Sequence, residues 1–242
     1  PDDVARAMTR AKSHFDRRAR QVGDAAVFQA RGRIHGAEDY EGFEGAGLAI
    51  EAVPEDLALK REVFAELEQH CTPQTVLATN TSALTLAEIG EGLAHPERVV
   101  GMHFFSPVRR RPLLEVVRGP HTSPRTLGVA LDFARRIHKV PLVVGDGPGF
   151  YTTRVLAFTI LAALDMVQAG HAVEDVDEAA RRVGWSMGPF EVVDMLGVPM
   201  TMGIARTMAE AFPGRFTYPE VGDRVAAAGW TGRGAGRGFY VH

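Results

Sequence analysis

His103 and Glu115 are the two residues of this sequence whose types and spacing most favour chemistry. Both lie in apolar segments, His103 in VVGMHFF (99–105) and Glu115 in LLEVV (113–117). A buried carboxylate is costly unless a donor or a cation compensates it. If the intervening arginine-rich stretch is a hairpin tip centred on Arg109, the two side chains lie opposite each other. Such a pair fixes the imidazole tautomer and suits general acid–base catalysis. The alternatives are a purely structural pair or an exposed face of an edge strand.

Polar residues also follow two other apolar segments, at the points where predicted strands end. Asn80 and Ser82 lie at the end of TVLATN and just beyond it, and Glu55 and Lys60 follow GLAIEAV (47–53). Ligand-facing loops of an open α/β sheet lie at the carboxyl ends of its strands, so these four are candidate binding residues. The plainer roles are turn and capping chemistry for the first two and a solvated helix start for the others.

The first 145 residues alternate strand and helix patterns. Helices are predicted at 2–21, 56–69 and 123–138, with a short one starting at the capping-box sequence T-x-x-E of Thr85–Glu88. Strands are predicted at 33–35, 47–53, 75–80, 99–105, 113–119 and 140–146. Strands separated by helices of this length indicate βαβ units and a mostly parallel sheet.

The sequence from Pro148 onward is almost entirely helical. The cluster GDGPGF (145–150) is rich in turn residues and suits a domain boundary. Helices are predicted at 151–169, 173–183, 189–196, 198–211 and 218–228, before a glycine-rich tail with an aromatic, strand-like end. We therefore expect two domains, 1–145 and 146–242. Apolar stripes on the later helices indicate a core and, by extension, a homodimer interface.

Composition excludes several classes of function. The net charge of -3 gives no basic excess for nucleic-acid binding, and no apolar run is long enough for a membrane span. The charged start lacks the apolar region of a signal peptide, which favours a cytoplasmic location. Cys71 is the only cysteine, and the histidines show no paired metal-ligand spacing, so we expect neither a disulfide nor a metal site.

Five motifs, in order along the chain, resemble the L-3-hydroxyacyl-CoA dehydrogenase family. They are TNTSALTLAEI, GMHFFSPVRRRPLLEVVRG, DGPGFYTTRVL, GWSMGPFEVVDMLG and GRGAGRGFY. The family includes 3-hydroxybutyryl-CoA dehydrogenases and the dehydrogenase part of the fatty-acid oxidation multienzymes. The resemblance implies a Rossmann-type NAD domain, an all-helical C-terminal domain that usually dimerises, and oxidation of L-3-hydroxyacyl-CoA to 3-ketoacyl-CoA.

The resemblance also implies roles for individual residues. His103 matches the family's catalytic histidine, Glu115 the glutamate that orients it, and Ser82 the serine that hydrogen-bonds the C3 oxygen of the substrate. Three residues match positions that contact the cofactor: Glu55, Lys60 and Asn80. His103 would take the C3 hydroxyl proton while hydride leaves C3 for NAD. The Arg109–Arg111 run would be a solvated loop tip or a contact for the phosphates of coenzyme A.

Two positions depart from the family pattern. Where the family usually has H-F-F-N-P, and N-R after P-G-F, this sequence has Ser106 and Thr153. Both family asparagines lie at the active site. A hydroxyl reaches less far than an amide and cannot supply its separate donor and acceptor. We expect Ser106 and Thr153 at the substrate, with altered preference or weakened activity.

No G-x-G-x-x-G lies between a strand and a helix near the start. The similar run GRGAGRG (232–238) follows a helix and cannot open a βα turn. Because the sequence begins within a helix, we expect an N-terminally incomplete NAD domain without its first βαβ unit. One alternative function is therefore an impaired fragment that keeps an acyl-CoA cleft and dimerisation helices but binds no dinucleotide. Another is a dehydrogenase of a free hydroxy acid, against which the HFF–P–LLEVV arrangement argues.

Overall fold

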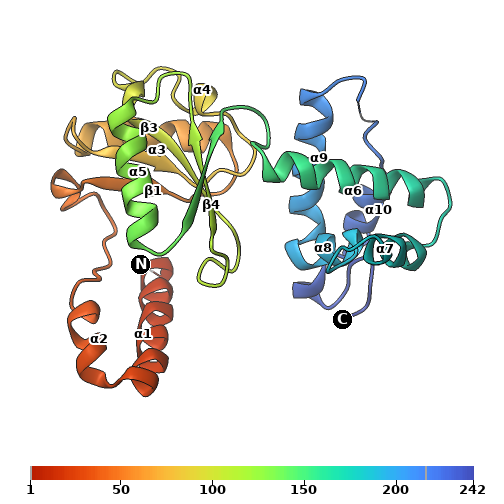
Figure 1. Cartoon of the computed structure of the whole chain (residues 1–242), viewed down its shortest axis with the longest axis horizontal. Coiled ribbons are helices and arrows are strands. Elements are labelled where there is room, and N and C mark those ends of the chain that lie inside the picture. Colours follow the sequence, from red (N-terminus) through yellow and green to blue (C-terminus); the bar gives the residue numbers. More distant parts are fainter. Residues whose placement is uncertain (1, 216) are drawn as a thin grey trace.

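The computed structural model describes residues 2–215 and 217–242. Figure 1 shows three parts along the chain: a pair of helices, an α/β part and a group of helices. The described residues of the α/β part form one sheet of five strands in the order β1-β2-β3-β4-β5. Their bounds are β1 Leu48–Glu51, β2 Val76–Thr79, β3 Val99–Phe104, β4 Leu113–Arg118 and β5 Val140–Gly145.

The sheet is mostly parallel, as predicted. Three of its neighbouring pairs are parallel, and only β3 and β4 are antiparallel. The antiparallel pair is the predicted hairpin, with the arginine-rich segment as its connection. β1, β2 and β3 therefore end at the same edge of the sheet, and the hairpin tip extends from that edge.

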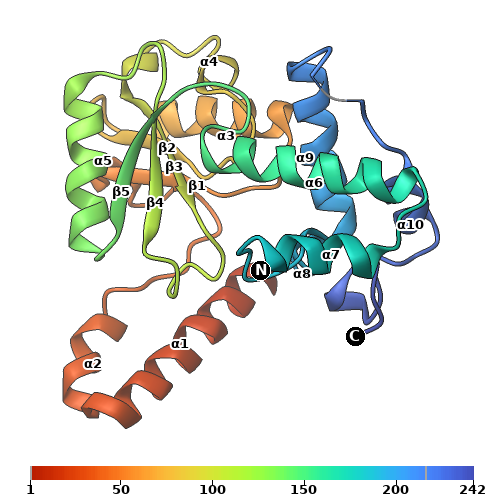
Figure 2. The same cartoon turned by 45° about the vertical axis from the view of Figure 1, so that its right-hand side comes forward.

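Helices cover both faces of the sheet (Figure 2). α3 (Leu57–His70) and α4 (Leu86–Ile89) pack on one face, where Phe64 and Leu67 meet strand side chains such as Leu77. α5 (Pro124–Arg136) packs on the other face through Ala130 and Ala134. The starts of all three helices are capped by side chains, those of Asp56, Thr85 and Ser123. The capping box of Thr85 and Glu88 is confirmed.

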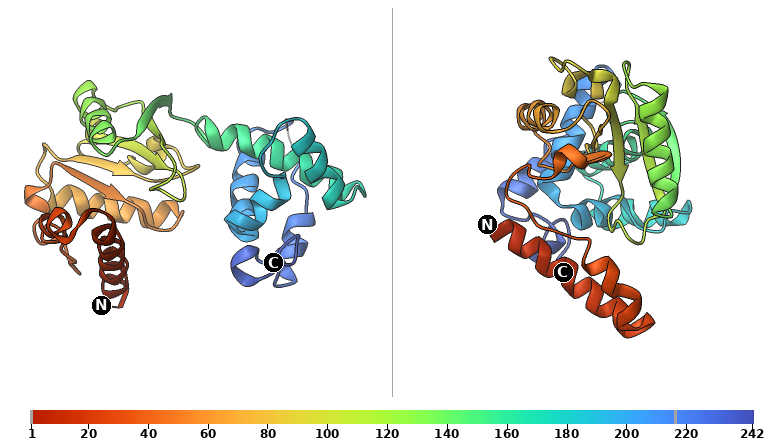
Figure 3. Two further views of the ribbon diagram at one scale, coloured as in Figure 1. Left: turned by 60° about the horizontal axis from the view of Figure 1, so that its bottom comes forward. Right: turned by 90° about the vertical axis from the view of Figure 1, so that its left-hand side faces the viewer.

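The prediction for residues 33–35 is wrong. These residues form a turn and irregular structure, while α1 (Asp2–Val22) is followed by α2 (Asp24–Arg31), which the sequence pattern did not indicate. Within the described residues, no strand of the sheet lies beside 33–35 to pair with them. α1 and α2 form a pair that projects from the α/β part and is joined by an ion pair between Asp16 and Arg31 (Figure 3).

The C-terminal part is helical, as predicted. Its helices are α6 Thr152–Gln168, α7 Val173–Arg182, α8 Pro189–Leu196, α9 Val198–Ala211 and α10 Val221–Ala227. α6 leads directly away from the α/β part, and the other helices gather around it (Figure 1). Leu164, Phe190 and Met202 are among the side chains of the buried core between them. No described helix is both long and apolar enough to cross a lipid bilayer.

Two buried aspartates organise this helical part. Asp177 on α7 accepts hydrogen bonds from the first turn of α8 and from the hydroxyl of Tyr240. Asp194 on α8 accepts from the N–H groups of Phe239 and Tyr240 in the tail. The predicted strand-like tail makes only isolated bridges within the described residues, so side-chain bonds to the two aspartates, together with these bridges, hold it in place.

Candidate active site

His103 on β3 and Glu115 on β4 are direct partners. They are opposite each other in the antiparallel register, and His103 Nδ1 lies 2.7 Å from Glu115 Oε2. Glu115 is fully buried, and His103 is only 6% exposed. The predicted pairing of these two residues is confirmed. A carboxylate can only accept, so the His103 proton is on Nδ1 and Nε2 is left as the free basic nitrogen.

The start of α6 also binds Glu115. The backbone N–H groups of Tyr151 and Thr152 donate to Oε1 over 3.1 and 2.9 Å. The Thr152 hydroxyl donates to Oε2 over 2.7 Å. Burial alone would raise the pKa of Glu115, but hydrogen bonds from His103 and Thr152 outweigh it and lower that pKa. The carboxylate therefore stays ionised inside the protein.

A tight connection brings α6 to this position. Gly149 has a φ of +68°, and a Cβ there would lie 2.7 Å from the sulfur of Met208, so both conformation and space require glycine. The Arg154 guanidinium donates to the carbonyl of Pro148 over 3.1 and 3.2 Å. These contacts fix the first turn of α6 against the sheet. Phe150, at the end of the connection, places its ring 6.1 Å from that of His103.

Asn80 lies beside the pair. Its side-chain oxygen accepts a hydrogen bond from the N–H of Phe104, the residue after His103, over 2.9 Å. This bond joins the end of β2 to the end of β3. The amide nitrogen of Asn80 makes no hydrogen bond within the described part of the chain. It is therefore available to a ligand at the strand ends.

Glu55 fixes the loop that carries Ser82. Its Oε1 accepts hydrogen bonds from the hydroxyl of Thr81 over 2.6 Å, the N–H of Ser82 over 2.8 Å and the N–H of Ala83 over 3.0 Å. Burial would raise the pKa of Glu55, but these bonds and the charge of Lys60 lower it. The Ser82 hydroxyl has no partner among the described residues. Glu55 thus holds the loop and leaves that hydroxyl free.

Lys60 is buried, with 1% of its surface exposed. Its Nζ donates to Glu51 Oε1 over 2.8 Å and to the Val53 carbonyl over 3.2 Å, and it lies 3.4 Å from Glu55 Oε2. The amino group therefore faces the protein's own acceptors. In this structure Lys60 reaches the strand ends only through Glu55.

Ser106 and Thr153 are not joined to the histidine–glutamate pair. Ser106 is exposed at the hairpin tip, where its carbonyl accepts from Arg111 over 3.4 Å. Thr153 is partly buried and makes no hydrogen bond to Glu115 within the described residues. The neighbouring Thr152 is bonded to the carboxylate instead. The sequence pattern did not indicate the contacts of Tyr151 and Thr152 with Glu115.

The match to family models agrees with this architecture. Residues 1–147 match the family described as "3-hydroxyacyl-CoA dehydrogenase, NAD binding domain", and residues 149–242 match "3-hydroxyacyl-CoA dehydrogenase, C-terminal domain". Fold and site define a two-domain, NAD-dependent oxidoreductase. The chain belongs to the 3-hydroxyacyl-CoA dehydrogenase family, and NAD is its cofactor.

Solved structures resemble the chain over nearly all of its length. FadB2 of M. tuberculosis is 34% identical with a TM-score of 0.90, and the match covers 99% of this chain and 86% of that one. The 3-hydroxybutyryl-CoA dehydrogenase of Escherichia coli is 29% identical with a TM-score of 0.92, covering 100% of this chain and 52% of that one. The (S)-3-hydroxybutyryl-CoA dehydrogenase PaaH1 of Ralstonia eutropha is 27% identical with a TM-score of 0.91, covering 99% and 86%.

Proposed function

We propose that this protein oxidises L-3-hydroxyacyl-CoA to 3-ketoacyl-CoA, with His103 as the general base and Glu115 as the residue that orients it. The observation that best supports this proposal is the 2.7 Å hydrogen bond between His103 Nδ1 and Glu115 Oε2. It leaves Nε2 free as the base, and the ionised carboxylate favours the imidazolium that forms. Two of the similar solved structures are named as 3-hydroxybutyryl-CoA dehydrogenases, which supports a short acyl chain as substrate.

His103 Nε2 takes the proton of the C3 hydroxyl, and Glu115 stabilises the resulting positive charge without itself being protonated. NAD, when bound, supplies the acceptor for the hydride that leaves C3. Ser82 donates a hydrogen bond to the C3 oxygen. Ser106 and Thr153 contact the substrate around that centre through hydroxyls in place of the family's amides. In the reverse direction the imidazolium returns the proton.

The residues present fit the nicotinamide end of the cofactor. The free amide nitrogen of Asn80 is a neutral donor at the strand ends, which suits an uncharged carboxamide and ribose. Glu55 holds the loop beside it, and Lys60 supports Glu55 from the interior, 3.4 Å away. The sequence contains no glycine-rich turn between a strand and a helix for the pyrophosphate. Asn80, Glu55 and Lys60 are proposed to contact or shape the site of the nicotinamide half.

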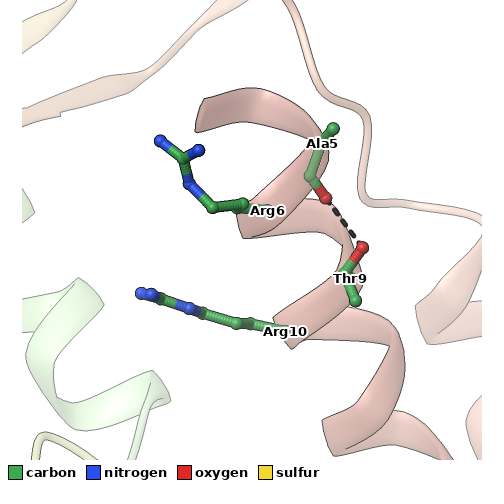
Figure 4. A pocket seen from close by; sticks show the side chains of 4 residues that line it. All are labelled: Ala5, Arg6, Thr9 and Arg10. Carbon is green, nitrogen blue, oxygen red and sulfur yellow. Dashed lines mark hydrogen bonds between the residues drawn. The ribbon is translucent and has the colours of Figure 1, made fainter. Parts of the chain in front are cut away.

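Basic side chains near the hairpin tip suit the phosphates of coenzyme A. Arg109 contacts His14 on α1, and desolvation together with the charges of Arg109, Arg17 and Arg18 lowers the pKa of His14. Arg6 and Arg10 extend from one side of the same helix, with Thr9 bonded to the carbonyl of Ala5 behind them (Figure 4). Arg6 is paired with Asp3, whereas Arg10 has no ion-pair partner among the described residues.

The C-terminal helices are proposed to form a homodimer. They expose large apolar side chains: Val155 52%, Met166 49%, Val183 80%, Met195 40% and Met200 52%. A contiguous apolar patch marks an association surface, and the proposal is that these side chains contribute to one. Sedimentation equilibrium measures the state directly, and a monomer at micromolar concentration would contradict this assignment.

The decisive experiment is NADH production from 3-hydroxybutyryl-CoA by the protein and by a His103→Gln variant. Glutamine keeps a hydrogen-bonding side chain of similar length but cannot accept the proton. We expect kcat/KM to fall by at least about 100-fold, the lower range for loss of a general base. Equal rates in the two proteins would refute the catalytic assignment. A calorimetric titration with NADH separates an inactive fragment, which would bind no dinucleotide, from an active enzyme.

A further inference from the structure

The Thr152 hydroxyl shares an acceptor with the catalytic pair. It donates to Glu115 Oε2, the oxygen that also accepts from His103 Nδ1, and both distances are 2.7 Å. The other oxygen, Oε1, is occupied by the two backbone N–H groups of the same helix turn. Oε2 therefore accepts two hydrogen bonds, one from the uncharged hydroxyl of Thr152 on α6 and one from the imidazole of His103 on β3.

We propose that Thr152 is a positioning residue for the reaction, whose hydroxyl sets how strongly Glu115 holds the protonated form of His103. The proposal rests on the proposed function, in which His103 is the base. A donor to a carboxylate favours its charged, unprotonated form and makes it a weaker acceptor for its other partners. The hydroxyl of Thr152 and Nδ1 of His103 thus compete for the same oxygen, Oε2 of Glu115. Removal of the hydroxyl should therefore strengthen the hold of Glu115 on the imidazolium.

Apart from His103, Thr152 is the side chain that bonds to Glu115 within the described residues. The pKa of Glu115 is lowered by the bonds from His103 and Thr152, against the effect of burial. Charged groups on the neighbouring elements are engaged elsewhere or exposed. The two cations Arg154 and Lys139 donate to backbone carbonyls, Arg154 to that of Pro148 and Lys139 to those of Val108 and Arg111. The two carboxylates Asp146 and Glu55 accept from backbone N–H groups, Asp146 from Leu86 and Ala87 and Glu55 from the Ser82 loop. The side chains of Tyr151 and Arg118 are exposed. None of these side chains is hydrogen-bonded to Glu115 in the described part of the chain.

Thr152→Val tests the proposal because it removes the hydroxyl and keeps the branched shape. The pKa of His103 is measured by NMR titration of its ring, with the resonance assigned by its loss in His103→Gln. We expect that pKa to rise by about 0.5–1 unit in Thr152→Val, because Oε2 then interacts with the imidazolium alone. The acid limb of the kcat/KM profile should move to higher pH by the same amount. Thr152→Ser, which keeps the hydroxyl, should restore both values.

Thr159→Val is the matched control, since it makes the same change two turns further along α6, away from Glu115. It should leave the His103 pKa and the pH profile unchanged. An unchanged or lowered pKa in Thr152→Val would overturn the proposal, as would an equal shift in Thr152→Ser. The NMR titration needs no turnover. Full activity in His103→Gln would therefore defeat the proposed function, while the titration would still decide whether Thr152 acts on His103.

Discussion

Single residues of the site are of two physical kinds. Glu115 and Glu55 are carboxylates turned inward, and each is held by three or more donors. Such carboxylates stay ionised because the protein supplies the hydrogen-bond donors that water would otherwise supply. Arg10 on α1 is an exposed cation without an ion-pair partner in the described part of the chain, so it is free to meet an anion. Under the proposed function, the two carboxylates shape the reacting centre, and the exposed cation affects substrate binding alone.

Arg10→Ala tests whether an exposed cation on α1 binds a phosphate of the substrate. A phosphate that loses one exposed cationic contact binds more weakly, by the few tenths to about 1 kcal/mol that such pairs contribute. We expect the KM for 3-hydroxybutyryl-CoA to rise about 2- to 5-fold with kcat unchanged, measured as initial rates at low salt. Because salt screens exposed charges, the difference should shrink at high ionic strength.

Arg136→Ala is the control for this prediction. Arg136 is an exposed arginine on α5, where it pairs with Asp132, and it lies outside the α1 surface. Its removal should not change KM. A KM for Arg10→Ala equal to that of the wild type at low salt would argue against phosphate binding on α1.

At the scale of elements, local patterns predicted most of the fold. The hairpin of β3 and β4 followed from two apolar segments of matching length around a polar tip, and that symmetry also gave the register of His103 and Glu115. The strand predicted at 33–35 failed because a strand needs a neighbour, and a local pattern cannot tell whether one lies alongside. α2 was missed because its eight residues, DAAVFQAR, show little periodicity of their own.

The candidate site was predicted only in part, for a related reason. Asn80, Ser82, His103 and Glu115 stand out because polar residues interrupt or end apolar strands. Thr152 does not stand out, since a threonine in the first helical turn is an ordinary capping choice. Its contact with Glu115 depends on the turn at Gly149 and on packing against Met208, 59 residues further along by number, which no local pattern contains.

The tail of the helical part depends on a close approach at Gly238. A Cβ there would lie 2.0 Å from Oδ1 of Asp194, which binds the next two residues of the tail. Gly238→Ala must therefore displace a buried carboxylate, and we expect a loss of about 2 kcal/mol or more in the free energy of unfolding. Gly128→Ala on the exposed face of α5 meets no atom within 4 Å and should gain about 0.5–1 kcal/mol. Urea denaturation measures both, and equal stability of the two variants would refute this account of the tail.

At the scale of the whole molecule, carboxylates that bind backbone N–H groups tie the parts together. Glu115 joins the sheet to α6, and Asp146 joins the end of β5 to α4. Glu68 on α3 joins that helix to the segment before β3, through the N–H groups of Ala94 and His95 over 2.8 and 2.9 Å. Each of these contacts is stronger when the acceptor is ionised. The stability of the assembled molecule should therefore depend on pH in the range where carboxylates titrate.

Burial would raise the pKa values of Glu55, Glu68 and Glu115, but hydrogen bonds and nearby cations lower all three below the ordinary value of 4.5. A carboxyl whose pKa is lower in the folded than in the unfolded chain contributes stability that is fully present above its ordinary value and is lost as pH falls through the lowered one. We expect these groups to leave the free energy of unfolding constant from pH 7 to about 5 and to reduce it steadily below about 4.5. Urea denaturation at a series of pH values measures this dependence.

The Glu68→Gln variant, changed away from the active site, separates the contribution of one carboxylate. Its free energy of unfolding should be lower at pH 7 and should fall less on acidification, because an amide cannot titrate. Parallel curves for Glu68→Gln and the wild type would show that the Glu68 contact does not contribute to acid sensitivity.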